Sequence, residues 1–329
     1  MTRAAVSQAT LDRARRDNLG HRLVALADDF SGRVLAAYHR HGYTDIRPVH
    51  GSVLRNLELS GTRLTVLAAR AGITHRAMAK LVANVEAMGL IQQRRDPRDA
   101  RARQISYTPE GLQLLRQSSA IIEGIYRVYS RIMGAEALQA LELRLYEFLT
   151  ALDIEITVSG QQALHSVRPE KPRNNRKTYV SHNIGRYLQL LGDDYHRRCA
   201  AIMAAAGHTG VRIDHLAVVS HLSLTGMNLS QLSESAGISL QATGKQVTSL
   251  QRLGYVTVTV DSRDKRVRQV AFSTQGHAFI AALLAAFATI ETEYCNIVGR
   301  PKLRELQESL AHAAHALGLS VPLSSPARL

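Results

Sequence analysis

The chain has 329 residues, a formal net charge of +14 at pH 7, two cysteines and no tryptophan. This length has room for about two domains, each large enough to bury its own core. Two cysteines exclude a disulfide framework, and Met1 is followed by no apolar stretch long enough for a signal peptide or a membrane span. We therefore expect a cytoplasmic protein without membrane contact, and the charge favours a polyanionic partner.

The first part of the chain predicts four helices. Their apolar residues recur at three- and four-residue steps, as in amphipathic helices. These helices cover residues 11–40, 48–59, 65–71 and 74–88. Gly72 ends the third, Thr74 can cap the fourth with its hydroxyl, and Gly89 stops it. The last two helices therefore form a helix-turn-helix.

The segment 90–107 predicts a two-stranded hairpin. Short β-prone runs at 90–93 and 104–107 flank a charged turn. Thr108 and Pro109 then open another helix, with threonine as cap and proline in the first turn. A last helix is expected from about 135 to 156. The order of elements is that of a winged helix-turn-helix between long terminal helices.

The whole pattern returns after 165 residues without a gap. The run DPRDARARQ at 96–104 is followed by DSRDKRVRQ at 261–269, and His50 aligns with His215. A period of this length is a whole domain and not a solenoid unit. We expect a first winged helix-turn-helix domain over 10–157, a basic linker over 158–182 and a second such domain over 183–318. The expected fold class is mainly α with small β-wings.

The two helix-turn-helix segments carry the first candidate DNA contacts. Such a motif lays its second helix in the major groove, where base edges can be distinguished. Lys80 recurs as Lys245; its alternative role is that of a solvated charge. The candidates are Thr74, His75, Arg76 and Lys80 in the first copy, and Ser239, Gln241 and Lys245 in the second.

The charged turns carry the second set of candidates. Wing arginines can enter a narrow minor groove, and a neighbouring aspartate can hold the guanidinium by paired hydrogen bonds. A charged turn alone is usually a solvated hairpin, but this one follows a helix-turn-helix and occurs twice. The candidates are Arg94, Arg95, Arg98, Asp99, Arg101 and Arg103, and then Arg263, Asp264, Arg266 and Arg268.

The first copy resembles the MarR family of transcriptional regulators. The resemblance lies in LTVLAARAGIT at 64–74, LV at 81–82 with MGLI at 88–91, RDPRDAR at 95–101 and YTPEG at 107–111. The second copy resembles it over 229–276 and departs at 273–276 (STQG), which lacks the proline of the first copy. MarR proteins are usually homodimers with interleaved terminal helices, each subunit reading half of a near-palindrome. The resemblance implies that the two copies here form an intramolecular pseudo-dimer through their long terminal helices.

The two copies differ where they should read bases. His75 aligns with Leu240 and Arg76 with Gln241, whereas buried positions match better. We therefore expect an asymmetric operator with two unlike half-sites about one helical turn apart. The first copy is expected to bind more strongly.

His50 and His215 are candidates for an effector site. The resemblance implies a small, often aromatic or phenolic, molecule that releases DNA on binding between the dimer helices and the winged domain. The alternative for both histidines is a structural hydrogen bond where helices join. Cys199 and Cys295 are expected to be small core side chains, with a redox switch as the alternative.

The sequence thus predicts a DNA-binding transcriptional regulator that is most simply a ligand-responsive repressor. The alternative is a binding module in which only the first copy reads DNA and the second serves dimerisation or ligand sensing. An enzyme is not expected, because no nucleophile–base pair is found. Gly244-Lys245 is not a phosphate loop, since Gln246 stands where serine or threonine is needed. No histidine, cysteine or carboxylate cluster has metal-site spacing, so neither metal nor cofactor is expected.

Overall fold

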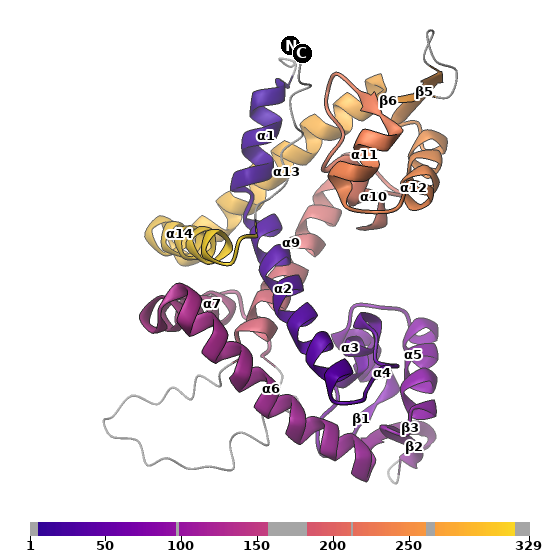
Figure 1. Ribbon diagram of the computed structural model, residues 1–329, viewed down its shortest axis with the longest axis vertical. Helices are drawn as coiled ribbons and strands as arrows, with labels where there is room; N and C mark the ends of the chain where they lie inside the picture. Colours follow the sequence, from indigo (N-terminus) through magenta and orange to yellow (C-terminus); the bar gives the residue numbers. More distant parts are fainter. Residues whose placement is uncertain (1–5, 97–98, 157–182, 212, 261–266, 320–329) are drawn as a thin grey trace. The chain divides into compact units, whose positions relative to one another are not determined.

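A computed structural model of the chain describes residues 6–96, 99–156, 183–211, 213–260 and 267–319 (Figure 1). The chain forms two compact units, one of Leu26–Leu190 and the other of Met1–Ala25 with Leu191–Leu329. The boundaries fall inside two helices, α2 (Leu19–Arg40) and α9 (Ile184–Ala205). The opening residues of each sequence copy therefore belong to the unit that holds most of the other copy.

The unit of Leu26–Leu190 contains a winged helix fold. Its three strands form an antiparallel sheet in the order β1-β3-β2, next to the helix-turn-helix. The elements are η1 (Pro48–His50), α3 (Gly51–Leu54), β1 (Thr62–Arg63), α4 (Leu64–Arg70), α5 (His75–Ala87), β2 (Ile91–Asp96), β3 (Asp99–Tyr107), α6 (Pro109–Met133) and α7 (Ala135–Ala151), with parts of α2 and α9.

The second unit repeats this fold with the sheet order β4-β6-β5. Its core joins the sheet and helix-turn-helix to the first half of α13 through Val247, Val270 and Phe279. The elements are α1 (Gln8–Asp17), α10 (Ile213–Val219), β4 (Met227–Asn228), α11 (Leu229–Ala236), α12 (Leu240–Arg252), β5 (Val256–Val260), β6 (Arg268–Phe272), α13 (Thr274–Val298) and α14 (Arg300–Ala316), with parts of α2 and α9.

The single helix predicted over 11–40 is wrong. The chain breaks at Asn18, whose backbone is extended, and α1 ends there before α2 begins. The Asn18 side-chain oxygen accepts the His21 backbone N–H at 2.8 Å, and its amide donates to the Tyr195 hydroxyl at 2.8 Å. Asn18 therefore caps α2 while it is held by a side chain from α9.

Two smaller differences concern the ends of elements. The helix predicted over 48–59 is shorter, since α3 ends at Leu54, and the helix predicted to reach residue 156 ends at Ala151. The two-residue strands β1 and β4 were not predicted. The caps at Thr74 and Thr108 are confirmed, because their hydroxyls accept the backbone N–H groups of Ala77 and Gly111.

A ring packs on a glycine in both units. In one, the Tyr195 ring of α9 covers Gly20 of α2 so closely that a Cβ on the glycine would overlap it. In the other, the Phe30 ring of α2 covers Gly185 of α9 in the same way. Phe30 and Tyr195 are 165 residues apart, as are the two glycines. Both rings are buried, with 6% and 2% of their surface exposed, so neither has room to move aside.

An aspartate, an arginine and a tyrosine form the same network in both units. The Tyr129 hydroxyl donates to Asp29 at 2.6 Å, and the Arg33 Nε donates to the same carboxylate at 2.7 Å. The guanidinium also lies over the Tyr129 ring, 5.5 Å from its centre. Burial, followed by the Asp29 charge and hydrogen bond, raises the pKa of Tyr129, so its hydroxyl stays protonated and can donate.

The second unit has the same three interactions. Asp194 accepts the Tyr294 hydroxyl at 2.8 Å and the Arg198 Nε at 2.7 Å. Arg198 also donates to Glu293 at 2.8 Å, and its guanidinium lies 5.3 Å from the centre of the Tyr294 ring. The network therefore ties α9 to α13 here, as its counterpart ties α2 to α6.

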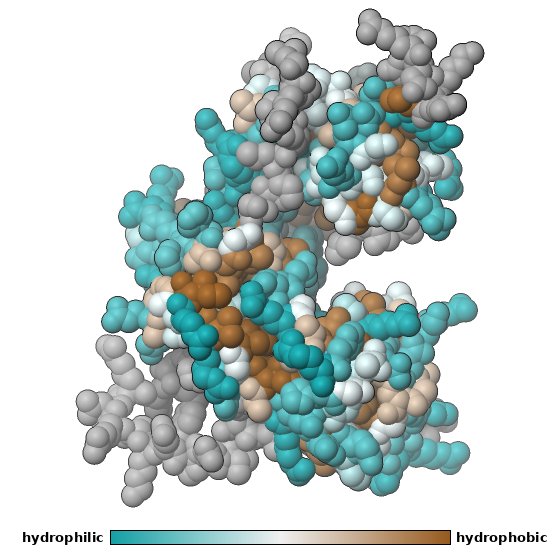
Figure 2. Space-filling view, viewed as in Figure 1, coloured by the Kyte–Doolittle hydropathy of each residue, from teal (hydrophilic) through white to brown (hydrophobic). Residues whose placement is uncertain are grey.

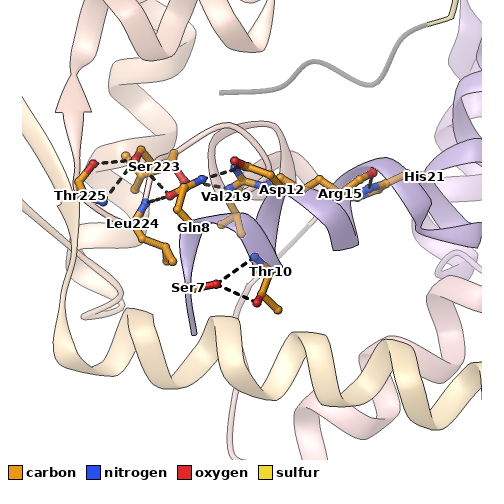
Figure 3. A network of polar contacts seen from close by, with 11 residues as sticks. Ser7, Gln8, Thr10, Asp12, Arg15, His21, Val219, Ser223, Leu224 and Thr225 are labelled. Atoms are coloured by element: carbon orange, nitrogen blue, oxygen red, sulfur yellow. Dashed lines mark hydrogen bonds and ion pairs between the residues drawn. The ribbon is translucent and has the colours of Figure 1, made fainter. Parts of the chain in front are cut away.

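Helix α1 holds the segment that precedes β4 (Figure 3). The buried Arg15 guanidinium donates from Nη2 to the carbonyls of Val219 and Leu222, both at 2.9 Å. The side-chain oxygen of Gln8 accepts the Leu224 backbone N–H at 2.8 Å. These two carbonyls lie at and beyond the end of α10, where no further helical turn supplies N–H donors. Arg15 therefore provides their hydrogen bonds.

One helix among the described residues, α13, is long and apolar enough to cross a membrane by length and composition alone. Some of its apolar residues pack within the unit. Phe279, Ile280 and Ala286 belong to the core with the helix-turn-helix, and Tyr294 binds Asp194. Packing within the unit therefore covers part of the apolar surface of α13, whose most apolar stretch is 33% buried.

The ring-on-glycine contacts predict which glycines are required. Gly20→Ala and Gly185→Ala should each lower the free energy of unfolding by about 1–3 kcal/mol, because a buried ring must shift. Gly32→Ala is the matched control in α2, since a Cβ there meets nothing within 4 Å. It should be neutral or stabilise the chain by up to about 1 kcal/mol. Urea unfolding measures all three, and equal losses at Gly20 and Gly32 would refute the assignment.

Acid should weaken the unit that contains α1. Burial lowers the pKa of His21 and of His221 from 6.5, and the Arg15 charge lowers both further. Near pH 6.5 the unfolded chain therefore binds protons that the folded chain does not bind. The stability present above this pH is lost as the pH falls. Each histidine contributes at most about 1.4 kcal/mol per pH unit.

Urea midpoints at pH 8 and pH 5.5 measure this loss. The double variant His21→Asn with His221→Asn should lose less stability on acidification than the natural chain. His312→Asn, at an exposed position of α14, is the control and should behave like the natural chain. An unchanged pH dependence in the double variant would show that these two histidines are not responsible.

Candidate nucleic-acid interface

Helix α5 is fixed at its start by a cap and along one side by the core. Thr74 caps it by accepting the Ala77 N–H at 3.2 Å. Met78, Val82 and Val85 are fully buried. This spacing puts the three side chains on one face, so the positions between them point outward. His75, Arg76 and Lys80 are all exposed on this outer surface.

Helix α12 is fixed in the same way. Ser239 caps it by accepting the Ala242 N–H at 3.2 Å. Thr243, Val247 and Leu250 are buried, each 165 residues after its counterpart in α5. Each helix therefore turns the equivalent face toward the core of its own unit, and the same positions face outward in each.

The outward residues of α12 are less polar than those of α5. Leu240 stands where α5 has His75, and 51% of its surface is exposed. Gln241 and Lys245 are exposed beside it. Figure 2 shows hydrophobic residues on the surface of the unit that contains α11 and α12.

The wing of the first copy is the hairpin β2–β3. Arg94 pairs with Gln104 and Arg95 with Arg103 across the strands. All three arginines are exposed. Arg94 donates to Gln92 at 3.1 Å on the surface. The hairpin therefore presents a cluster of guanidinium groups beyond the end of α5.

A carboxylate in α5 braces this wing. Glu86 accepts the Gln93 backbone N–H at 2.8 Å and the Gln93 side-chain amide at 2.6 Å. The second copy has Gln251 and Val258 at these positions, and valine offers no side-chain donor. Glu86 was not among the predicted residues, because its only sequence signal is a carboxylate near the end of a helix that precedes a strand with a glutamine.

The second wing is less basic where it is described. Thr259 and Val260 replace the Arg94–Arg95 pair, and Val260 is 59% exposed. They pair with Gln269 and Arg268, of which Arg268 is exposed. The predicted tip contacts in both copies lie outside the described residues or side chains. These are Arg98, Asp99 and Arg101, and Arg263, Asp264 and Arg266.

Exposed basic side chains around the two helices and wings differ in number between the copies. In the described part of the chain, the first copy has Arg76, Lys80, Arg94, Arg95 and Arg103, and the second has Lys245, Arg252 and Arg268. Among the described side chains, the first copy therefore carries more exposed positive charge.

His50 and His215 both make internal hydrogen bonds. The buried His50 accepts the Arg47 backbone N–H through Nδ1 at 3.1 Å, at the start of η1. Burial, and then the Arg47 charge, lower the pKa of His50, which leaves the ring neutral and able to accept. His215 in α10 bonds Ser249 of α12 at 3.0 Å. Both rings thus join neighbouring elements, and their role as ligand contacts stays a prediction.

Two further features bear on chemistry. Burial raises the pKa of the Cys199 thiol to about 11, which keeps the reactive thiolate scarce at neutral pH. Within residues that the structure describes, no group of three histidine, cysteine or acidic side chains could hold a metal ion.

Searches against known proteins found similarity at the level of structure alone. No protein-family model matches the sequence, and no curated protein matches it. A MarR-family transcriptional regulator from Rhodococcus sp. RHA1 is 16% identical, with a TM-score of 0.33, over 44% of this chain and 98% of its own. The YusO protein from Bacillus subtilis is 19% identical, with a TM-score of 0.34, over 44% and 99% respectively.

A third structure is a mutant of MepR from S. aureus bound to an oligodeoxyribonucleotide. It is 11% identical, with a TM-score of 0.31, over 39% of this chain and 94% of its own. Each of these three proteins spans about two-fifths of the present chain. The class that the fold defines is a mostly helical protein with small antiparallel sheets, of the winged helix type.

Proposed function

We propose that the chain is a sequence-specific regulator of transcription that binds double-stranded DNA. The observation that carries this proposal is the outward face of α5, where His75, Arg76 and Lys80 lie exposed on a helix fixed by its cap and core. A helix presented in this way fits the major groove, and an adjacent basic hairpin can follow the backbone or enter the minor groove.

The proposal includes a single-chain pseudo-dimer. Each unit combines a winged fold with the opening helix residues of the other sequence copy, as interleaved subunits of a dimer would. Once one of two linked DNA-binding domains is bound, the other is present at its half-site at a high effective concentration. Because α5 and α12 differ at their outward positions, the operator is a pseudo-palindrome with unlike halves.

The proposal also includes repression that responds to an effector. A protein that covers a promoter excludes polymerase, and a ligand that alters the spacing of the two reading helices would release it. The resemblance to the MarR family supports an aromatic or phenolic effector, with His50 and His215 as candidate contacts. Both rings already make hydrogen bonds within the protein. A ligand would therefore contact them through neighbouring side chains.

A second candidate function assigns DNA reading to the first copy alone. It is favoured by the outward surface of α12, where exposed Leu240 and Gln241 replace two residues that can carry positive charge. In that case the second copy serves dimerisation or ligand sensing.

Footprinting of the purified chain on its own promoter region tests the proposal. We expect a protected site and a steep loss of affinity with rising salt, because bound phosphates release counterions. Protection that spans two unlike half-sites one helical turn apart supports the pseudo-dimer, and protection of one half-site supports the alternative. Weak binding that is independent of sequence would contradict both.

Matched substitutions in the two copies measure their separate contributions. Lys80→Ala and Lys245→Ala should each weaken binding and lower the salt slope by about one. Arg101→Ala should cost more affinity than Arg266→Ala, because the first copy is the more basic. Affinity measured by fluorescence anisotropy at several salt concentrations decides this, and equal losses at the two arginines would contradict the order.

A further inference from the structure

Corresponding positions on the two reading helices carry unlike groups for contacting bases. The buried faces of α5 and α12 match at 165-residue spacing, so Arg76 and Gln241 occupy the same place on the outward surface. His75 and Leu240 precede them on the first turn. Differences between these residues are therefore differences in chemistry at one fixed geometry.

The outward side chains are available to a ligand. Arg76 and Gln241 are both exposed and take part in no hydrogen bond or ion pair with another described residue. Leu240 has 51% of its surface exposed and lies outside the core of its unit. An apolar side chain in this position gains by covering another apolar group.

The three side chains match three different base edges. A guanidinium fork bonds both O6 and N7 of guanine, and a carboxamide bonds both N6 and N7 of adenine. An apolar side chain contacts the methyl group of thymine, which projects into the major groove. None of these matches holds for the counterpart in the other copy.

We propose that Arg76 selects a guanine in one half-site, and that Gln241 and Leu240 select an adenine and a neighbouring thymine in the other. The operator then has one half defined by a G·C pair and one defined by A·T pairs. This inference rests on the proposed function and adds the bases that each copy reads. Lys80 and Lys245 are identical, so they do not distinguish the halves.

Selection from a random duplex library, followed by sequencing, tests the assignment. The natural chain should select a motif with unlike halves. Arg76→Gln should change the preferred guanine to adenine, and Gln241→Arg should change the preferred adenine to guanine. The double exchange should interchange these bases between the halves. Each correct bidentate pair should favour its base by roughly tenfold to a hundredfold.

Further variants separate base reading from general binding. Leu240→Ala should weaken the thymine preference alone. Lys80→Gln is the control on the same face as Arg76, and should weaken binding to all sequences without changing the motif. Glutamine and arginine have similar helix propensities, and circular dichroism with a urea midpoint verifies that each variant is folded.

The outcomes distinguish this inference from the function on which it rests. If the natural chain selects no motif, both are wrong. If it selects a motif but Arg76→Gln weakens all sequences equally, then Arg76 contacts phosphate, the inference is wrong and the regulator stands. A motif with two identical halves also overturns the inference while leaving DNA binding established.

Discussion

The contact on which both units depend is an aromatic ring packed on a helical glycine. Tyr195 lies on Gly20 in one unit and Phe30 lies on Gly185 in the other. Both contacts join α2 to α9, the two helices that also carry Asp29 and Asp194 with their hydrogen bonds to tyrosine. The winged folds are then held against these helices by α6 and α13. A change at either glycine should therefore reach the whole of its unit.

The helix-turn-helix and wing could be predicted from the sequence because their signals are local. Caps at Thr74 and Thr108, the turn at Gly72 and the alternating strands at 255–260 depend on a few neighbouring residues. The break at Asn18 could not be predicted in this way, because the apolar period continues through it. That helix end involves Tyr195, far along the chain, whose hydroxyl accepts a hydrogen bond from the Asn18 amide.

The exposure of the candidate residues could be predicted, but the contacts that hold their elements in place could not. Exposed Arg76, Lys80 and Arg94 were expected, whereas the brace between Glu86 and Gln93 depends on two elements meeting in space. The two-residue strands β1 and β4 are too short to leave a periodic pattern. The exposure of Leu240 also required the structure, since a leucine at that point of a helix could as well have been buried.

Fusion of the two copies has a consequence for how the reading surfaces change over time. In a homodimer, one substitution alters both reading helices at once, so the two half-sites must stay alike. Here α5 and α12 are encoded separately, and a substitution at Arg76 leaves Gln241 untouched. In the proposed complex, two unlike recognition helices would allow only one orientation on the site. The proposed operator would then have polarity, and inverting it would present a different copy to the approaching polymerase.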